Sequence, residues 1–345
     1  MFEKMQQNGH EKVLFCYDQD TGLQSIIAIH STVLGPALGG VRMYPYKTSD
    51  EAITDVLRLS KAMTYKNAMA GIDFGGGKAI IIGNPKVNKT VDLLQKFGSF
   101  VGSLGGEYYT AIDVGIDSED LKHIRFKSPW VLGTHRVDTA KATARGIIAA
   151  MRACTNDDLR GIRVAVQGVG KVGSNLVELL VYHGAVVTIA DIDTSAVVRM
   201  HDDYGVAVVS PEDIYSVECD IFSPCSFGGV LNDDTIPLLK CPMVIGGANN
   251  QLLDDRHDLM IRDMAILYIP DYIVNSGGVI YIAGEYLLED EAQTFAKIDN
   301  IFTTVCNIMN YAGENDMTVL EAANYFVEMR INHGQPAASF YCEVR

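Results

Sequence analysis

Residues 161–191 constrain the fold of this chain more than any other stretch. An apolar run, Gly161–Gln167, leads into the glycine pattern Gly168-Val169-Gly170-Lys171-Val172-Gly173, and a second apolar run ends at Asp191. In such a strand–turn–helix–strand unit the first glycine makes the turn, the second admits a pyrophosphate, and the third lets the helix pack on the strand. Asp191 follows Gly168 by 23 positions (191 − 168 = 23), where a carboxylate accepts hydrogen bonds from a ribose 2′-hydroxyl and repels a 2′-phosphate. The pattern predicts a Rossmann domain that binds NAD in preference to NADP.

Two alternatives accompany this prediction. A tight turn without a ligand has the same glycine spacing, and Asp193 competes with Asp191 for the ribose. We expect a helix over Ser174–His183 and a strand over Ala185–Ala190 to complete the unit.

Further apolar runs after residue 191 continue the alternation of strands and helices. They are Asp220–Cys225, Met243–Asn250 and Ala265–Gly278. Parallel sheets bind ligands where strands end, so the amides of Asn249, Asn250 and Asn275 are candidates to bind a carboxamide or a substrate carboxylate. The alternative is that these asparagines only shape turns. We expect helices over Val279–Tyr286, Asp299–Ala312 and Glu321–Asn332, the last of which returns to the first domain.

A second glycine-rich stretch, Lys61–Ile82, carries the candidate catalytic group. Three glycines, Gly75 to Gly77, directly precede Lys78 and the apolar run Ala79–Ile82. We expect these glycines to form a loop that a ligand can approach, because they lack Cβ atoms. Partial burial of Lys78 beside apolar neighbours lowers a lysine pKa and makes it a candidate base. The alternative is a glycine-rich turn with solvated lysines.

Two more charged residues join this candidate site. Lys66 lies near the end of a helix predicted over Ser49–Asn67, with Ser49 as its N-cap, and is a candidate anchor for a carboxylate. Asp113 directly follows a strand predicted over 107–112, where an acid is well placed for a cleft. An Asx-turn or a helix cap is the alternative role for Asp113.

Composition excludes several classes of function. The chain has 345 residues, with 28 Lys and Arg against 43 Asp and Glu, so its formal net charge of −15 argues against binding nucleic acid. The seven cysteines are scattered and the eight histidines have no metal-ligand spacing, so we expect reduced thiols and no metal site. With no apolar run of about 20 residues and a polar N-terminus, we expect a soluble cytoplasmic protein without membrane contact.

The chain resembles the glutamate/leucine/phenylalanine/valine dehydrogenase family, and within it the leucine and phenylalanine dehydrogenase branch. The matching blocks are GPALGGVRMYPY, MTYKNAMAGIDFGGGKAIIIG, TAIDVG, VAVQGVGKVG, CDIFSPCSFGGVLNDDTI, GGANNQL and PDYIVNSGGVIYIA, which span residues 10–330 in order. The resemblance implies reversible, NAD-dependent oxidative deamination of an L-amino acid to its 2-oxo acid and ammonia. It also implies a substrate domain and a Rossmann domain with a cleft between them, in a homo-oligomer such as a dimer or octamer.

The resemblance also implies roles for individual residues. Lys66 would bind the substrate carboxylate, Lys78 would be the general base that activates water, and Asp113 would relay protons. Thr143 matches the family threonine at the nicotinamide carboxamide. The complete NAD site would comprise Thr143, Gly168, Gly170, Lys171, Val172, Gly173, Asp191, Ile192, Ala248, Asn249 and Asn275.

The substrate site implied by the resemblance is apolar around the side chain. It would include Leu38, Gly39, Gly40, Met63, Ala111, Asn275, Val279 and Ile282 in addition to Lys66. No such residue pairs with a second carboxylate, so glutamate is disfavoured as a substrate. Ala111 is typical of leucine enzymes, whereas IDFGGGKA, CSFGGVLND and DYIVNSGG resemble phenylalanine enzymes. We therefore expect a substrate of the leucine, valine or isoleucine type, with an aromatic amino acid as the alternative.

Some positions depart from the family pattern. The segment HRVDTAKATARG is shorter than usual and lacks proline, Ile112 stands where leucine enzymes often have Glu, and Ala62 and Gly284 replace a usual Gly and a usual acid or Ala. These departures affect the expected hinge and specificity but leave the chemical groups in place.

The predicted fold is thus α/β, with two domains. We expect the substrate domain over 1–135, completed by 325–345, and the NAD-binding domain over 136–324. Two other functions compete with the dehydrogenase. A non-catalytic NAD sensor would have no need of the set Lys66, Lys78 and Asp113, and a hydroxy-acid dehydrogenase would need a catalytic His–Asp pair that the sequence lacks.

Overall fold

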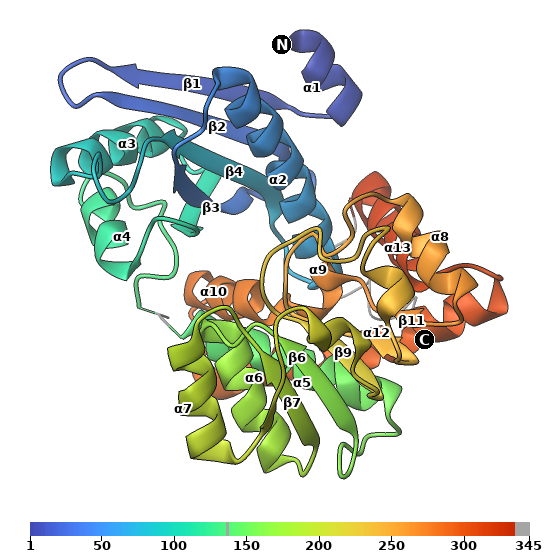
Figure 1. Ribbon diagram of the computed structural model, residues 1–345. Helices are drawn as coiled ribbons and strands as arrows, with labels where there is room; N and C mark the ends of the chain where they lie inside the picture. The colour runs from blue at the N-terminus through green and yellow to red at the C-terminus, as the bar shows by residue number, and fades with distance from the viewer. Residues whose placement is uncertain (136–137, 335–345) are drawn as a thin grey trace. The chain divides into compact units, whose positions relative to one another are not determined.

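The computed structural model describes residues 1–135 and 138–334 and divides into two compact units (Figure 1). Among the described residues, the first unit comprises 1–135, Ile282–Leu288 and 327–334, and the second comprises Asp138–Tyr281 and Glu289–Phe326. The predicted α/β fold with two domains is therefore confirmed. Residues 136–137 and 335–345, which include the predicted boundary and most of the predicted C-terminal segment, lie outside the described residues.

The first unit is built on a mixed sheet of five strands in the order β1-β2-β4-β3-β5. Its strands are β1 (Lys12–Asp18), β2 (Leu23–Ser31), β3 (Ala37–Tyr44), β4 (Gly75–Ile82) and β5 (Tyr108–Ile112), and its helices include α1 (Phe2–Asn8), α2 (Ser49–Met69), α3 (Val91–Ser103) and α4 (Ser118–Arg125). β1 and β2 form an antiparallel hairpin, and β2 is antiparallel to β4. The pairs β3–β4 and β3–β5 are parallel.

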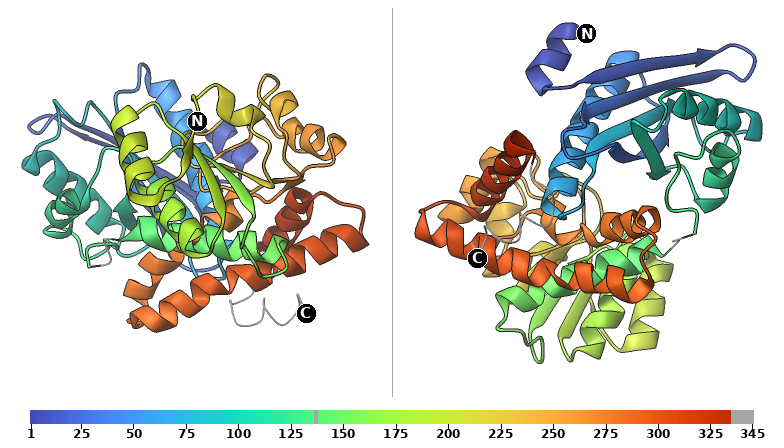
Figure 2. Two further views of the ribbon diagram at one scale, coloured as in Figure 1. Left: turned by 60° about the horizontal axis from the view of Figure 1, so that its bottom comes forward. Right: turned by 180° about the vertical axis from the view of Figure 1, so that it is seen from behind.

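Alternate residues of these strands pack on opposite layers of helix. Ala79 and Ile81 of β4 lie in a core with Leu93 and Phe97 of α3, whereas Ile80 lies in a core with Val56 and other residues of α2. Figures 1 and 2 show α2 along one face of the sheet and α3 with α4 over the other. Because strand side chains alternate with a period of two, Lys78 is on the α2 face together with Ile80. This alternation sets the layer in which the candidate site lies.

The second unit is built on six parallel strands in the order β11-β10-β9-β6-β7-β8. Its strands are β6 (Arg163–Gln167), β7 (Val186–Ala190), β8 (Ala207–Val208), β9 (Ile221–Pro224), β10 (Met243–Val244) and β11 (Leu267–Tyr268). The strand order reverses beside β6, the strand that leads into the glycine pattern, as in Rossmann domains. The predicted Rossmann domain is confirmed.

Helices and two short 3₁₀ turns complete the chain. The helices are α5 (Thr139–Cys154), α6 (Lys171–Tyr182), α7 (Thr194–Tyr204), α8 (Arg256–Asp263), α9 (Asp271–Val274), α10 (Gly277–Tyr286), α11 (Glu291–Asp299), α12 (Ile301–Glu314) and α13 (Val319–His333), and the turns are Asp213–Ser216 and Ile236–Leu238. Late in α13, Arg330 is fully buried and donates to the carbonyls of Ala68 and Ile72 and to the Asp73 carboxylate. The C-terminal helix thus returns to the first unit, as predicted.

Several predicted boundaries are wrong. Thr48 rather than Ser49 is the N-cap of α2, because its hydroxyl accepts from the Glu51 N–H. The apolar runs Met243–Asn250 and Ala265–Gly278 contain strands of only two residues each, β10 and β11, because Gly246 and Pro270 soon end them.

Candidate active site

The three glycines before Lys78 lie inside a strand and do not form the predicted loop. All of Gly75–Gly77 belong to β4, and none has a positive φ. A Cβ on Gly75 would lie 1.9 Å from the Ser31 carbonyl oxygen, and one on Gly76 would lie 2.1 Å from the Thr64 amide nitrogen. A Cβ on Gly77 would meet the Tyr108 ring at 2.8 Å. The glycines therefore serve close packing of β4 on β2, α2 and β5, and this contact fixes Lys78 relative to α2.

Lys78 and Asp113 form an ion pair on the buried α2 face of the sheet. The Lys78 side chain is 8% exposed, and its Nζ lies 3.0 Å from Oδ2 of Asp113, which follows the parallel strand β5. Burial opposes ionisation of Asp113, but the charges of Lys78 and Arg42 outweigh it and lower its pKa to about 2. Asp113 is therefore a carboxylate at neutral pH, and the stability that it contributes is lost only as the pH falls toward 2.

The position of Asp113 is set by the loop that it begins. The Met43 amide donates to the Val114 carbonyl at 2.9 Å, which ties the loop to β3. Gly115 has φ +80°, and a Cβ there would lie 2.3 Å from the Met43 carbonyl oxygen, so the turn requires glycine. Asp117, and not Asp113, caps the following helix α4. Asp113 is thus a carboxylate held at a strand end and not a helix cap.

Arg42 binds the same oxygen of Asp113 and was not identified from the sequence. Its Nε lies 3.0 Å from Asp113 Oδ2, and its Nη1 lies 3.0 Å from Asp55 Oδ2. Asp55 also accepts from the Tyr46 hydroxyl at 2.5 Å and from Arg58 at 3.0 Å. The signal was present in the sequence: Arg42 lies two positions after Gly40, so both fall on the face of β3 that carries the site.

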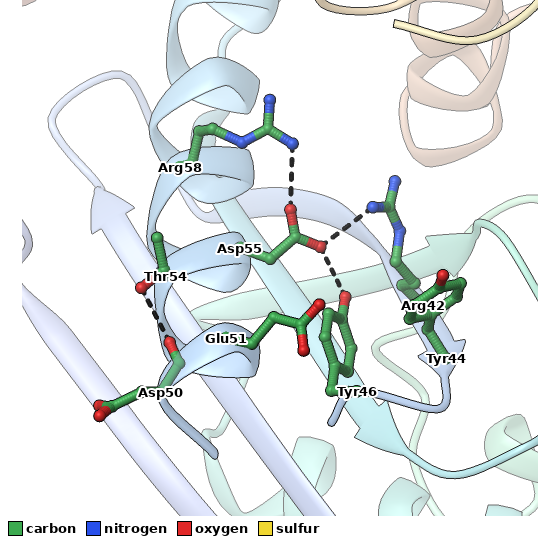
Figure 3. A pocket seen from close by; sticks show the side chains of 8 residues that line it. All are labelled: Arg42, Tyr44, Tyr46, Asp50, Glu51, Thr54, Asp55 and Arg58. Atoms are coloured by element: carbon green, nitrogen blue, oxygen red, sulfur yellow. Dashed lines mark hydrogen bonds and ion pairs between the residues drawn. The ribbon is translucent and has the colours of Figure 1, made fainter. Parts of the chain in front are cut away.

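The first unit has a pocket of about 510 Å³, whose lining includes Arg42, Tyr46, Asp55 and Arg58 (Figure 3). It is formed by the end of β3, the residues after it and the first turns of α2. Figure 3 shows Arg58 above the Asp55 carboxylate, Arg42 to its right and Tyr46 below it. Arg42 therefore connects this pocket to the Lys78–Asp113 ion pair.

Most residues predicted to bind substrate gather around Lys78. Leu38 pairs with Gly76 and Tyr109 in the sheet, and Gly40 pairs with Ala111. Cβ atoms built on Gly39 and Gly40 would lie 3.3 Å from Met63 Cγ and 3.0 Å from Asp113 Cβ. Leu38 and Ala111 are buried, Met63 and Lys66 are half-buried, and Lys66 is in the last turn of α2. The structure thus brings Leu38, Gly39, Gly40, Met63 and Ala111 into the layer of Lys78.

The remaining predicted substrate residues divide between the units. Ile282 is buried in the first unit and lies 3.8 Å from the position of a Cβ on Gly133. Val279 and Asn275 are buried in the second unit.

The glycine pattern of the second unit has the geometry that a pyrophosphate requires. Gly168 has φ +95° in the turn after β6, and Gly170 is the N-cap of α6 with no atom within 4 Å of a built Cβ. A Cβ on Gly173 would lie 1.9 Å from the Gly168 carbonyl oxygen, so the helix packs directly on the turn. The helix was predicted to begin at Ser174 but begins at Lys171, so Lys171 and Val172 lie in the first turn of α6. The residues present therefore fit a dinucleotide phosphate at the N-terminus of α6.

Asp191 and Asp193 have different roles in the structure. Asp191 accepts from the Val169 amide at 2.7 Å and from the Asp193 amide at 2.8 Å, so its carboxylate faces the glycine turn. Asp193 caps α7 by accepting from the amides of Ser195 and Ala196. Ile192 between them is 81% exposed. The alternative that Asp193 binds a ribose is disfavoured, because Asp193 serves as a helix cap.

The asparagines of the second unit form one cluster. Asn275 Nδ2 donates to Asn249 Oδ1 at 2.9 Å and to the Gly247 carbonyl at 3.2 Å, which places both residues beside buried Ala248. Asn275 Oδ1 is buried and has no hydrogen-bond partner in the described part of the chain. Asn250 instead serves the turn, with φ +53° and its amide bonded to Asp271. An unsatisfied buried oxygen favours a donor supplied by a ligand.

Thr143 lies beside Gly277 and Gly278, which come after Asn275 and Ser276 in the sequence. Its hydroxyl donates to the Thr139 carbonyl at 2.8 Å within α5. A Cβ on Gly278 would lie 2.7 Å from Thr143 Oγ1, so glycine is required there for α10 to begin against α5. Among residues 1–135 and 138–334, no group of His, Cys, Asp and Glu has an arrangement that would hold a metal ion, and no helix is long and apolar enough to cross a membrane.

Comparisons with known proteins agree with this geometry. The family model described as "Glu/Leu/Phe/Val dehydrogenase, dimerisation domain" matches residues 10–128, and "Glutamate/Leucine/Phenylalanine/Valine dehydrogenase" matches residues 133–206 and 194–333. Phenylalanine dehydrogenase of Thermoactinomyces intermedius is 46% identical, with 96% of this chain and 94% of the relative covered. Leucine dehydrogenase of Geobacillus stearothermophilus is 41% identical, with 98% and 95% covered. The crystal structure of L-tryptophan dehydrogenase from Nostoc punctiforme is similar with a TM-score of 0.84 at 41% identity, covering 96% of this chain and 99% of that one.

Proposed function

The chain belongs to the glutamate/leucine/phenylalanine/valine dehydrogenase family, and we propose that it oxidises an apolar L-amino acid with NAD to the 2-oxo acid and ammonia. It is accordingly an oxidoreductase that acts on the CH–NH₂ group of amino acids and uses a nicotinamide cofactor. The choice of NAD, the roles of individual residues and the substrate are proposals that rest on the site geometry.

The observation that carries the proposal is the buried ion pair between Lys78 and Asp113. A lysine and a carboxylate 3.0 Å apart, with Lys78 only 8% exposed, place an amine that can take up and return a proton beside a carboxylate that stays ionised. A fully solvated lysine, the alternative raised by the sequence, would not be 8% exposed. The backbone of Gly39 and Gly40 beside this pair leaves space for a small substrate.

The reaction needs a group to activate water. NAD, when bound, would supply the acceptor for the hydride of the substrate Cα, and loss of this hydride would leave an iminium carbon on the substrate. Neutral Lys78 takes a proton from the water that adds to this carbon, and the Asp113 carboxylate stabilises the ammonium that forms. Lys78 then returns its proton to the amine, the C–N bond breaks and ammonia leaves. The hydroxyl gives its proton to the neutral Lys78, which yields the 2-oxo acid and leaves Lys78 as an ammonium that releases this proton to solvent before the next cycle. Lys66 binds the substrate carboxylate with its positive charge.

Residues of the second unit hold the cofactor in this proposal. The amides at the start of α6, with Gly168, Gly170, Lys171, Val172 and Gly173, bind the pyrophosphate. Asp191 binds the adenosine ribose beside Ile192. Ala248, Asn249 and Asn275, together with Thr143, would hold the nicotinamide carboxamide, and its NH₂ group would supply the donor that Asn275 Oδ1 lacks. The resemblance implies that the two units meet around one substrate in a cleft.

Asp191→Ala is expected to raise the KM for NAD about tenfold or more and to reduce the preference for NAD over NADP. The reason is that the variant loses a ribose hydrogen bond and a charge that repels the 2′-phosphate, each worth about 1–3 kcal/mol. Steady-state rates with each cofactor measure this change. Asp193→Ala should destabilise α7 but leave the NAD/NADP ratio unchanged, and an altered ratio in that variant alone would transfer the ribose role to Asp193.

Parallel assays on L-leucine, L-valine, L-phenylalanine, L-tryptophan and L-glutamate test the reaction and its substrate class. We expect NADH formation at alkaline pH with apolar substrates and rates on glutamate at least a hundredfold lower, because its second carboxylate would be buried unpaired. Ala111 supports leucine-type substrates, and 46% identity to a phenylalanine dehydrogenase supports aromatic ones. Activity on a 2-hydroxy acid without ammonia in the reductive direction would indicate the competing class, and NAD binding without turnover would indicate a sensor.

A homo-oligomer is part of the proposal. The family model that matches residues 10–128 is described as a dimerisation domain. Within the described residues β1 pairs with β2 alone and is an edge strand, with Phe15 54% and Tyr17 66% exposed. An edge strand with exposed aromatic side chains suits pairing with a second copy. Light scattering on the purified protein measures the mass directly, and a monomer at micromolar concentration would contradict this part.

A further inference from the structure

Four charged side chains form a continuous series in the first unit, from the buried interior to the pocket of Figure 3. Lys78 binds Asp113 Oδ2, Arg42 Nε binds the same oxygen, and Arg42 Nη1 binds Asp55 Oδ2, each at 3.0 Å. The side chains of Lys78, Asp113, Arg42 and Asp55 are 8%, 20%, 22% and 15% exposed. The series is therefore partly removed from water, where charge–charge interactions are stronger than at the surface.

The shape of the guanidinium makes Arg42 a rigid link. Its planar group presents Nε and Nη1 in fixed directions, and each nitrogen binds a different carboxylate. The Tyr46 hydroxyl donates to the same Asp55 oxygen that binds Arg42, Oδ2, whereas Arg58, which is 54% exposed, binds the other oxygen, Oδ1. Because Asp55 fixes one edge of the guanidinium, Arg42 cannot rotate without breaking contact with one of its two partners. Asp113 therefore meets a cation of fixed position.

We propose that Arg42 is a positioning residue, which orients the Asp113 carboxylate toward Lys78 and is itself held by Asp55. This inference rests on the proposed function, because it assigns Asp113 to the proton transfer with Lys78. Arg42 touches neither substrate nor cofactor in this account and acts through Asp113. Asp55 Oδ2, which also accepts from the Tyr46 hydroxyl, is then the support of Arg42 and, through Arg42, of the catalytic carboxylate.

The charges around Asp113 determine how removal of Arg42 changes the pKa of the Asp113 carboxyl. Lys78 on β4 and Arg42 on β3 are cations that bind Asp113, the charge of Asp113 raises the pKa of Tyr108 on β5, and Asp55 on α2 binds the far side of Arg42. Burial of Asp113 raises its pKa, and the two cations together lower it. Without Arg42, the Asp113 carboxylate keeps Lys78 but loses one of the two cations that favour its ionised form. The pH at which Asp113 is half protonated must then rise, and its side chain is held by fewer contacts.

The experiment compares Arg42→Gln with Arg58→Gln in the full-length protein. For Arg42→Gln we expect kcat to fall about tenfold or more with little change in the KM for NAD. We also expect the Asp113 carboxyl to titrate about one to two pH units higher, followed by NMR with ¹³C-labelled aspartate and assigned by its loss in Asp113→Asn. Arg58→Gln removes a cation bound to the same Asp55 without touching Asp113, so kcat and the midpoint should both stay at the wild-type values.

Three outcomes overturn the proposal. They are a folded Arg42→Gln with wild-type kcat, an unchanged Asp113 midpoint in that variant, and equal losses in Arg42→Gln and Arg58→Gln. Should Arg42→Gln fail to fold, Arg42→Lys replaces it, because it keeps the charge. We expect Arg42→Lys to lose kcat, since one ammonium cannot occupy the positions of both Nε and Nη1, and wild-type kcat in Arg42→Lys also overturns the proposal.

The proposed function fails separately from this inference. A wild-type protein that binds NAD but oxidises no amino acid refutes the reaction, while the Asp113 midpoint still reports on Arg42 in the same samples. A wild-type protein that is active, with an Asp113 midpoint independent of Arg42, refutes only the inference.

Discussion

Lys78→Ala is expected to reduce kcat for amino acid oxidation by roughly 10²–10⁴-fold, the usual contribution of a general base. The reason is the position of Lys78, which is 8% exposed, 3.0 Å from the Asp113 carboxylate and beside the backbone of Gly40, which pairs with Ala111. Among the described residues that form an ion pair, Lys78 is the most buried lysine. Steady-state kinetics give kcat, and calorimetric titration gives the Kd for NAD, which should not change.

Lys96→Ala is the matched control for this variant. Lys96 also pairs with a carboxylate, Asp18, at 2.8 Å, but its side chain is 41% exposed and belongs to α3, the helix on the other face of the sheet. We expect Lys96→Ala to retain turnover, since an exposed ion pair contributes about 0–1 kcal/mol to stability and this one is remote from the site. Normal turnover in Lys78→Ala would remove the assigned base.

Gly76→Ala is expected to lower the free energy of unfolding by about 3 kcal/mol or more. Adding a carbon atom to a well-packed core typically costs about 1–3 kcal/mol, so this loss is at or above the upper limit of that range. The added Cβ would lie 2.1 Å from both the amide nitrogen and the hydroxyl oxygen of Thr64 in α2. A backbone atom of a helix cannot move aside as a flexible side chain does, so β4 and α2 must separate. Urea unfolding measures the change, and activity should fall with it because Lys78 follows on the same strand.

Gly313→Ala is the control for this second variant. Gly313 lies in α12, has no atom within 4 Å of a built Cβ, and does not have a positive φ. Alanine has the higher helix propensity, so we expect stability to stay equal or rise by up to about 1 kcal/mol. A Gly76→Ala protein as stable as the wild type would show that α2 and β4 do not make the close contact described above.

The parts of the fold that were predictable from sequence have strong local signals. The glycine pattern between two apolar runs, with Asp191 after the second, predicts β6, α6 and β7. Each glycine has a separate steric role: Gly168 makes the turn, Gly170 leaves space for a phosphate and Gly173 lets the helix pack on the turn. The hairpin of β1 and β2 and the helix α2 follow from periodicity in the same way. Lys66, Lys78 and Asp113 were identifiable because charged residues beside glycine and apolar runs stand out in a sequence.

Other parts depend on contacts between distant segments. Gly75–Gly77 resemble a loop in sequence, and only the approach of Thr64, Ser31 and Tyr108 shows why a strand there needs three glycines. Arg42 and Asp55 look like ordinary surface charges until β3, α2 and β5 come together. The short strands β10 and β11 are stabilised by their neighbours in the sheet, so their apolar runs overstate their length.

The most direct test of the central claim is to follow NADH and ammonia together in one reaction with an apolar L-amino acid. The wild-type protein is expected to form them in a 1:1 ratio, with Lys78→Ala forming neither at a measurable rate while it still binds NAD. A folded wild-type protein that binds NAD but releases no ammonia from any apolar L-amino acid would contradict the claim.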